Sequence, residues 1–275
     1  GYRIEDLARE ATYEEVVHLL LYDRLPAADE LERMSDLLAA ERELPEHVLG
    51  ALRVQPRSAR SMDVLQAVAP LLAQGDTDVE DGSREASRRI GARLVARFPT
   101  LVAAWHRIRS GREPLAPDPD LGHAANLLFM LTGDRPDEER IRALDTCLVL
   151  HAEHSLNAST FAAREVCSTR AHMYAAVAAA VGSLSGELHG GANARVMHML
   201  REIGSQDHVA DYVRRTLDGG GKIMGMGHAV YRTMDPRARI LAPISRQLGE
   251  RAGDRGWHDL SVELERQARE AFRER

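Results

Sequence analysis

Hydrophobic positions in this chain recur every three or four residues, which is the spacing of one helix face. Over residues 28–42, for example, Leu31, Met34 and Leu38 lie three or four positions apart. Thr12, followed three residues later by Glu15, predicts a capping box before the apolar run VVHLLLY, and Pro26 ends this first helix. No segment alternates apolar and polar residues as a half-buried strand would. The pattern therefore predicts an all-α protein.

The same spacing, together with prolines and capping residues, predicts the remaining helices. One opens at Pro45, one is capped by Ser58 or Ser61, and others cover 83–97, 99–109, 121–132, 136–154, 157–170, 172–186, 192–203, 207–217, 236–251 and 257–275. The apolar stretch 173–184 suits a buried helix or a helix–helix interface. The acidic loop GDTDVEDG (75–82) is interpreted as a solvated turn, since it lacks the ligand spacing of a calcium loop.

Composition narrows the classes of function. The net charge of −6 and the absence of a basic stripe argue against nucleic acid as a partner. No apolar run approaches the ~20 residues of a membrane span, and no signal peptide is present, so we expect a cytoplasmic protein without membrane contact. Cys147 and Cys167 form no CxxC motif and are expected to be small buried hydrophobic residues in a reducing compartment.

The segment LHAEHSLNASTF (150–161) carries the first candidate site residues. His154 is expected at the end of a helix, where unpaired carbonyl groups favour imidazolium, which suits a carboxylate ligand. His151, Glu153 and His154 could instead hold a metal in a helical metallohydrolase, although zinc would need a further ligand that no spacing supplies. A structural role for each histidine is the third interpretation.

His189 lies in the segment GELHGGAN (186–193), where two glycines precede a helix expected from Ala192. Unpaired N–H groups and the positive end of that helix disfavour imidazolium, so we expect a neutral side chain. A neutral histidine can donate a hydrogen bond to a carbonyl oxygen that gains charge during a reaction. A turn without a catalytic role is the alternative.

The third segment, GGGKIMGMGHAVYRTMDPR (219–237), combines a glycine loop with a histidine and two arginines. It is not a Walker loop, because Ile223 and not Ser or Thr follows Lys222. Asp235 and Pro236 look like the N-cap and first residue of a helix, which places Arg237 in the first turn. The helix dipole disfavours a cation there, so a carboxylate should hold it. That carboxylate is either a ligand or a protein side chain.

Together these segments resemble the citrate synthase family, in the form common to bacterial and archaeal enzymes. LHAEHSLNASTF, GELHGGANARVM and KIMGMGHAVYRTMDPRA match its signature regions in content, order and approximate spacing, and the resemblance extends upstream through TYEEVVHLLLYDRLP and PDLGHAANLLFMLTG. It implies an all-α, multi-helical fold with a large domain, here 1–189, and a small domain, here 190–275, which close to exclude water. It also implies a homodimer, whose interface the apolar helix 172–188 suits.

The resemblance implies that acetyl-CoA condenses with oxaloacetate and that the citryl thioester is hydrolysed to citrate and CoA. The CoA thioester is then a co-substrate, with no tightly bound cofactor and no metal. His189 matches the histidine that stabilises the enol(ate) oxygen, and His228 the one that polarises and protonates the ketone. His154 and Arg237 match ligands of the dicarboxylate. The residues that match the CoA site are Arg232, as a phosphate contact, and Lys222, Met224, Gly225, Met226 and Gly227, as the loop lining the cleft.

The family's general base has no match in these 275 residues. It is an aspartate well beyond the HAVYRTMDPR segment, and Asp235, Asp254 and Asp259 are not at the matching position. The sequence also begins at Gly1 without methionine. We therefore expect a trimmed sequence that does not turn over by itself.

Two further interpretations stay open beside citrate synthase. A 2-methylcitrate synthase would use propionyl-CoA, and one extra methylene in an apolar pocket changes the free energy by only ~1–3 kcal/mol. A non-catalytic CoA-binding protein would lack the general base altogether.

Overall fold

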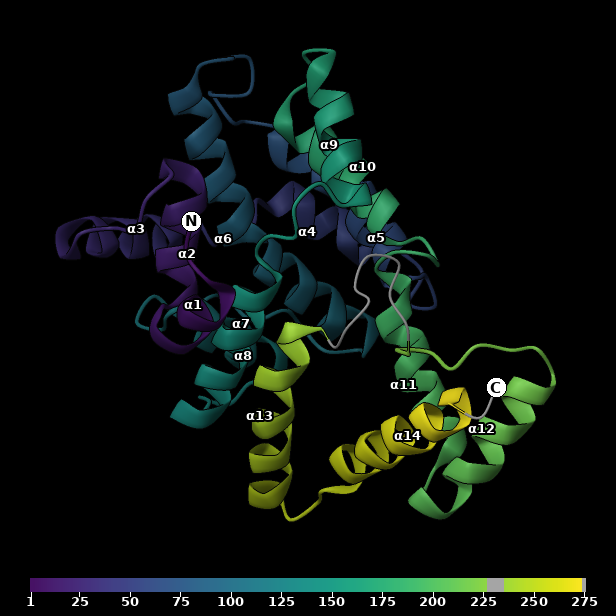
Figure 1. Cartoon of the computed structure of the whole chain (residues 1–275). Helices are drawn as coiled ribbons and strands as arrows, with labels where there is room; N and C mark the ends of the chain where they lie inside the picture. The colour runs from purple at the N-terminus through teal and green to yellow at the C-terminus, as the bar shows by residue number, and fades with distance from the viewer. Residues whose placement is uncertain (227–234, 274–275) are drawn as a thin grey trace. The chain divides into compact units, whose positions relative to one another are not determined.

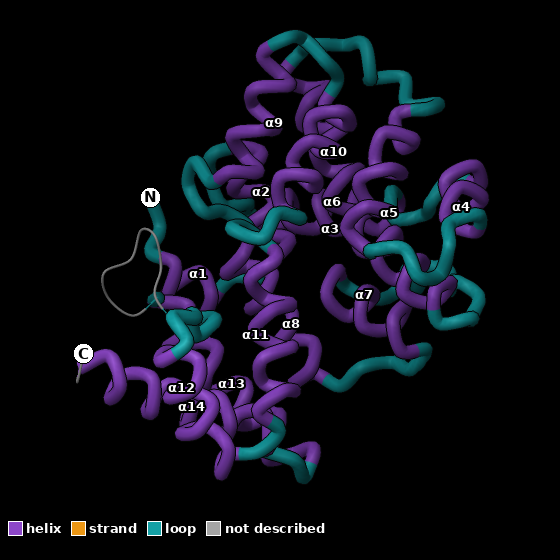
Figure 2. The backbone as a smooth tube through the Cα atoms, turned by 90° about the vertical axis from the view of Figure 1, so that its right-hand side faces the viewer, coloured by secondary structure: helices purple, strands orange, loops and turns teal. Residues whose placement is uncertain are grey.

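The computed structural model describes residues 1–226 and 235–273, and within these ranges all regular secondary structure is helical (Figures 1 and 2). The prediction of an all-α protein is therefore confirmed. The chain divides into two compact units, Gly1–Ser185 and Gly186–Arg275, which we call unit 1 and unit 2.

Unit 1 contains ten α-helices and one 3₁₀ helix. They are α1 (Ile4–Glu10), α2 (Tyr13–Tyr22), α3 (Ala28–Ala40), α4 (Glu46–Arg53), α5 (Ser61–Val68), η1 (Ala69–Ala73), α6 (Arg84–Arg109), α7 (His123–Thr132), α8 (Glu138–His151), α9 (Ala158–Ser168) and α10 (Met173–Leu184).

Local side-chain chemistry sets several of these helix starts. The Thr12 side chain accepts from the backbone N–H of Glu15 while Glu15 reaches back to the N–H of Thr12, so the predicted capping box at α2 is confirmed. The side chains of Asn157 and Ser83 cap α9 and α6, and each does so by accepting one backbone N–H. At α5 the cap prediction is wrong, because Arg60 is the N-cap and Ser61 is already the first helical residue.

The main core of unit 1 lies between α4, α5, α6 and α10. Its largest members are Trp105 and Tyr174, which are 2% and 0% exposed. A second cluster joins α2 and α3 to α6 through Val17, Leu38 and Ala96. Helix α6 thus takes part in both clusters, and its burial on several faces explains how it tolerates a proline.

The predicted break at Pro99 is wrong, because α6 runs without interruption from Arg84 to Arg109. A proline inside a helix removes one backbone hydrogen bond and costs ~3 kcal/mol. Leu94 and Leu101, on either side of Pro99, are 6% and 0% exposed. Burial of such side chains contributes roughly 1.5–3 kcal/mol each, so packing outweighs the local penalty.

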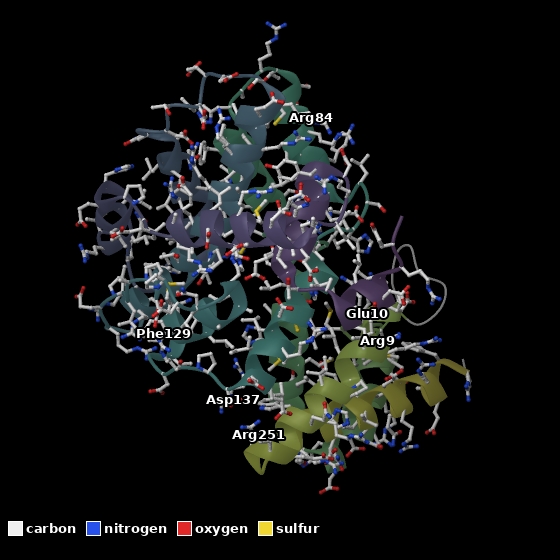
Figure 3. All side chains as sticks on the ribbon, turned by 90° about the vertical axis from the view of Figure 1, so that its left-hand side faces the viewer. Arg9, Glu10, Arg84, Phe129, Asp137 and Arg251 are labelled. Atoms are coloured by element: carbon white, nitrogen blue, oxygen red, sulfur yellow. The ribbon has the colours of Figure 1, made fainter. Side chains whose placement is uncertain are left out.

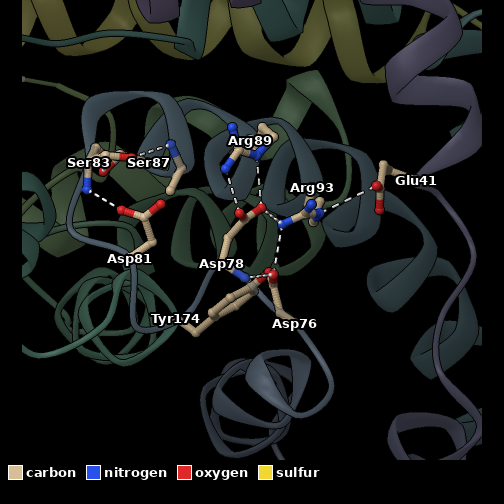
Figure 4. A network of polar contacts seen from close by, with 10 residues as sticks. Glu41, Asp76, Asp78, Asp81, Ser83, Ser87, Arg89, Arg93 and Tyr174 are labelled. Atoms are coloured by element: carbon tan, nitrogen blue, oxygen red, sulfur yellow. Dashed lines mark hydrogen bonds and ion pairs between the residues drawn. The ribbon is translucent and has the colours of Figure 1, made fainter.

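The acidic loop 75–82 is not the solvated turn expected from its sequence (Figure 4). The guanidinium of Arg93 lies 2.8 Å from Asp76 and 2.6 Å from Asp78, and 3.3 Å from Glu41 on the other side. Arg89 also pairs with Asp78. Hydrogen bonds from Arg89 and Arg93 hold the pKa of Asp78 well below its ordinary value. The loop is therefore an ion-pair anchor on α6.

This anchor also fixes α10, the helix that leads towards His189. The hydroxyl of Tyr174, in the first turn of α10, donates a hydrogen bond to Asp76. Burial, and then this bond to a carboxylate, raise the pKa of Tyr174. Burial alone would raise the pKa of Asp76, but the hydrogen bonds from Tyr174 and the N–H of Asp78 and the charge of Arg93 lower it. One network thus joins α3, α6, α10 and the acidic loop.

An apolar hollow of about 390 Å³ lies in unit 1, with walls from α6, α7, α8 and α10 and from Tyr13. His123, which is 3% exposed, lines it and stacks obliquely on the Tyr13 ring at 5.0 Å between centroids. Among the described residues, none forms a hydrogen bond with the imidazole of His123. Burial, and then the charge of Arg42, lower the pKa of His123 to about 4, against an opposing effect of Glu14.

The described residues of unit 2, 186–226 and 235–273, form four α-helices and one 3₁₀ turn. They are α11 (Gly191–Ile203), η2 (Gln206–His208), α12 (Val209–Asp218), α13 (Pro236–Ala252) and α14 (Gly256–Arg273). Its core joins α11, α12 and α14 through buried residues such as Leu200, Val213 and Leu264. Ile223, 2% exposed, belongs to the same core and anchors the loop that follows α12.

Charged side chains lie mainly on the outer faces of the helices, as Arg84 at the start of α6 illustrates (Figure 3). In the part of the chain that the structure describes, no helix is long and apolar enough to cross a membrane. Both cysteines are free thiols. Cys147 is half-buried but Cys167 is exposed, so the prediction that both are buried is wrong for Cys167.

Candidate active-site segments

His154 lies in the loop between α8 and α9 and is half-buried. Helix α8 ends at His151, so the prediction that the helix continues to His154 is wrong. The backbone turns away at Ser155, which adopts a left-handed conformation with φ of 50°. Asn157 then starts α9 by accepting the N–H of Thr160 at 2.8 Å. His154 therefore lies in a loop between the end of α8 and the start of α9, and not in the last turn of a helix.

The metal alternative at this segment receives no support from the described residues. The ring Nδ1 of His151 lies 2.6 Å from the carbonyl oxygen of Cys147, one turn back on α8. Over residues 1–226 and 235–273, no three His, Cys, Asp or Glu side chains are grouped as metal ligands would be. Of the two imidazoles in this segment, His151 is exposed and His154 is half-buried.

His189 lies in a tight turn between the end of α10 and the start of α11. The backbone N–H groups of His189 and Gly191 both donate to the carbonyl of Gly186, at 3.1 and 3.2 Å. Helix α11 begins at Gly191, one residue before the predicted start. The side chain is half-buried and precedes the N-terminus of α11, which has no side-chain cap and forms a partly positive end. A histidine here can meet an oxygen that gains negative charge.

The described part of the predicted CoA loop, Lys222 to Met226, packs on the same helix. Ile223 and the half-buried Met224 and Met226 belong to or pack against the unit 2 core. Gly225 adopts φ of +80°, which favours glycine, and a Cβ atom there would lie 3.3 Å from Cγ2 of Val196 on α11. Lys222 is exposed. The structure therefore brings the His189 turn and this loop together on α11 within one unit.

Sequence reasoning missed an ion pair that flanks His189. Glu187, two residues before it, pairs with Arg195 in the second turn of α11. The hydrogen bond from Arg195 lowers the pKa of Glu187, and the charge of Lys222 lowers it further. The opposite charges eight residues apart, on either side of the glycines, were the available signal.

Arg237 occupies the first turn of α13, as predicted. Asp235 is the N-cap, Pro236 is the first helical residue, and the N–H of Arg237 donates to Asp235 at 2.9 Å. The guanidinium of Arg237 also pairs with Asp235, with Nη2 to Oδ2 at 2.6 Å and Nε to Oδ1 at 3.0 Å. A protein carboxylate therefore pairs with this cation. The sequence left open whether that carboxylate belongs to a ligand or to the protein, and the structure shows Asp235.

Three predicted site residues, Gly227, His228 and Arg232, lie outside the described residues. Of the others, His154 belongs to unit 1, while His189, Arg237 and the loop Lys222–Met226 belong to unit 2. That His154, His189, His228 and Arg237 surround one cavity stays a prediction.

The chain is similar to citrate synthases over its whole length. A family model described as citrate synthase, C-terminal domain, matches residues 1–275. The citrate synthase of Haloferax volcanii is 45% identical over 270 residues, which cover 96% of this chain and 71% of that protein.

Solved structures give the same result for the fold. The citrate synthase of Pyrobaculum aerophilum superposes with a TM-score of 0.90 at 40% identity, covering 97% of this chain and 69% of that one. The citrate synthase of Thermoplasma acidophilum was solved as a ternary complex with carboxymethyl coenzyme A and oxaloacetate. It superposes with a TM-score of 0.93 at 29% identity, covering 99% of this chain and 72% of that one. The resemblance carried by the three histidine segments is thereby confirmed, and the chain belongs to the citrate synthase family.

Proposed function

We propose that the protein containing this chain is an acyltransferase that condenses acetyl-CoA with oxaloacetate and hydrolyses the product to citrate and CoA. Membership of the family, over a chain that spans about seven-tenths of its relatives' length, carries this proposal. The His189 turn and the Lys222–Met226 loop both lie on α11, which supports the proposal. Condensation needs a residue that acts on the thioester oxygen close to the loop that binds the CoA thioester.

The first step forms the enol(ate) of acetyl-CoA. The methyl group loses a proton to a general base, and negative charge develops on the thioester oxygen. We assign His189 to donate a hydrogen bond to this oxygen, in the partly positive region before α11. Donors fixed in place before the reaction stabilise developing charge more than mobile water does. No residue of 1–275 matches the base, so we infer that this proton goes to a residue outside them.

The second step forms the carbon–carbon bond. The methyl carbon attacks the keto carbon of oxaloacetate, and the ketone oxygen receives a proton, which we assign to His228. His154 and Arg237 would hold the two carboxylates of oxaloacetate. For Arg237 this requires that the guanidinium share its donors between Asp235 and the substrate, which its five N–H groups permit. Water then cleaves the thioester and releases citrate and CoA.

CoA enters this proposal as a co-substrate and not as a resident cofactor. Lys222 and Arg232 would meet its phosphates, and Met224, Gly225, Met226 and Gly227 would line its cleft. Gly225, at φ of +80°, adopts this backbone conformation without strain and leaves room for Val196 of α11, so the loop keeps its position on that helix. Lys222 is exposed and therefore accessible to a phosphate.

We further propose a large domain (1–189) and a small domain (190–275) that close over the substrates, in a cytoplasmic homodimer. The compact units Gly1–Ser185 and Gly186–Arg275 support two domains. Helix α9 supports a subunit interface next to α10, because none of its residues is buried and its Phe161 is 60% exposed. The two free thiols fit a reducing compartment.

Thiol release tests the proposal. On the full-length gene product, CoA should be released when oxaloacetate and acetyl-CoA are both present, and not with either alone. Propionyl-CoA should be used more slowly; equal or faster release with it would make the protein a 2-methylcitrate synthase. No release with either thioester would leave the non-catalytic CoA-binding interpretation.

A further inference from the structure

Among the described residues, the turn that carries His189 is held by a pair of backbone hydrogen bonds and by an ion pair. The carbonyl of Gly186 accepts the hydrogen bonds from the N–H groups of both His189 and Gly191. The ion pair joins Glu187 and Arg195. The hydrogen bonds close the turn on itself, while the ion pair ties the turn to the second turn of α11. His189 lies within the segment that the backbone hydrogen bonds and the ion pair hold.

The ion pair is exposed, with 62% of the Glu187 side chain and 42% of the Arg195 side chain accessible. Such pairs contribute little to the stability of a whole protein. A small contribution from the ion pair is still sufficient to fix the conformation of the turn that carries His189. The turn is six residues long, it contains three glycines, and neighbouring Leu188 is 97% exposed, so side-chain packing does little to hold it.

Arg195 also stands next to the contact between α11 and the Lys222–Met226 loop. Val196, the following residue, is the one that a Cβ at Gly225 would approach to 3.3 Å. The charge of Lys222 acts on Glu187 from the loop side. The same helical turn of α11 therefore positions the His189 turn through Arg195 and the loop through Val196.

We propose that Glu187 and Arg195 are positioning residues, whose ion pair holds the turn so that His189 is correctly oriented towards the thioester. This inference depends on the proposed function, since it assigns a purpose to the orientation of His189. Neither residue needs to touch a substrate. The pair matters through geometry, because catalytic hydrogen bonds lose much of their effect when their donors are misplaced.

Kinetics of four variants of the full-length protein test the proposal. Glu187→Gln and Arg195→Gln should each lower kcat by about 5-fold, because a misoriented hydrogen-bond donor loses part of its effect on the developing charge. The KM for oxaloacetate should stay unchanged. The double variant should be no slower than either single one, and exchange of the two charges (Glu187→Arg with Arg195→Glu) should restore most of kcat. Asp211→Asn, which breaks the exposed Asp211–Arg214 pair on α12, is the control and should change nothing.

A direct effect of charge on CoA binding gives the opposite pattern. Without Glu187 the KM for acetyl-CoA would fall, and without Arg195 it would rise, because the first change removes a negative charge and the second a positive one. Shifts of this kind in opposite directions, with kcat unchanged, would overturn the positioning role.

Amide exchange measured by NMR provides a readout that does not depend on activity. The N–H groups of His189 and Gly191 should exchange about 3- to 10-fold faster in both single variants and return to the parent rate after charge exchange. Unchanged rates would refute the inference. If the parent protein shows no condensation, the proposed function fails, while the exchange rates still decide whether the ion pair holds the turn.

Discussion

The imidazole of His123 should make unit 1 lose stability in mild acid. The ring is 3% exposed, lines an apolar hollow with Tyr13, and has a pKa of about 4 in the folded chain. In the unfolded chain a histidine titrates near 6.5. As the pH falls from neutrality, the unfolded state therefore binds the proton first. The stability is fully present above pH ~6.5 and is lost progressively as the pH falls towards 4.

The size of the effect follows from the two pKa values. A difference of about 2.5 pKa units corresponds to at most roughly 3 kcal/mol, at 1.36 kcal/mol for each unit. At pH 5.0 the unfolded histidine is almost fully protonated and the folded one almost fully neutral, so the loss relative to pH 7.5 is about 2 kcal/mol. This is a large share of the stability of an ordinary domain.

Urea unfolding at pH 7.5 and 5.0 measures this loss. Trp105 reports on unit 1, because it is 2% exposed in its core, and Trp257→Phe removes the signal from the exposed tryptophan of unit 2. In this background His123→Phe keeps the aromatic contact with Tyr13 but cannot titrate, and His123→Gln is a polar control. Both should lose about 2 kcal/mol less than the parent on acidification. An equal loss in parent and variants would refute the assignment to His123.

Three further predictions concern other parts of the molecule. Tyr174→Phe removes the hydrogen bond to Asp76 and should lower the stability of unit 1 by about 2 kcal/mol, or the Tm by roughly 4–8 °C, measured by thermal denaturation, whereas exposed Tyr2→Phe should not. Gly225→Ala should destabilise unit 2 by ~1–2 kcal/mol and weaken acetyl-CoA binding, because φ of +80° disfavours alanine; calorimetry that shows unchanged binding and stability would contradict this. Arg237→Lys should weaken oxaloacetate binding by about 10- to 100-fold in a calorimetric titration, since lysine lacks the bidentate geometry.

Local signals in the sequence predicted most of the helix boundaries correctly. The capping box of Thr12 and Glu15 and the N-cap and first-turn roles of Asp235 and Pro236 depend only on residues within one helical turn. Two of the predictions that failed, at Pro99 and in the acidic loop, depend on distant partners. Pro99 is tolerated because α6 is buried on several sides, and the acidic loop is ordered by Arg93, fifteen residues from Asp78, and by Tyr174, ninety-eight residues from Asp76.

The same limit applies to the candidate site. The family resemblance selected His189 and the Lys222–Met226 loop, and the structure brings both onto α11. Neither the glycine pattern nor the helix prediction indicated the pair of Glu187 with Arg195, because an eight-residue separation across a turn has no fixed geometry in sequence. For Arg237, the sequence predicted that a carboxylate would hold the cation, but only the structure identifies Asp235.

The most direct test of the proposed chemistry is the His189→Ala variant of the full-length protein. Citrate formation from acetyl-CoA and oxaloacetate should fall by at least about 100-fold, the usual effect of removing one donor to a developing oxyanion. Calorimetric titration should show oxaloacetate binding within about 2-fold of the parent, because His189 acts on the thioester. Citrate formation at the parent rate, or loss of oxaloacetate binding, would contradict the role assigned to His189.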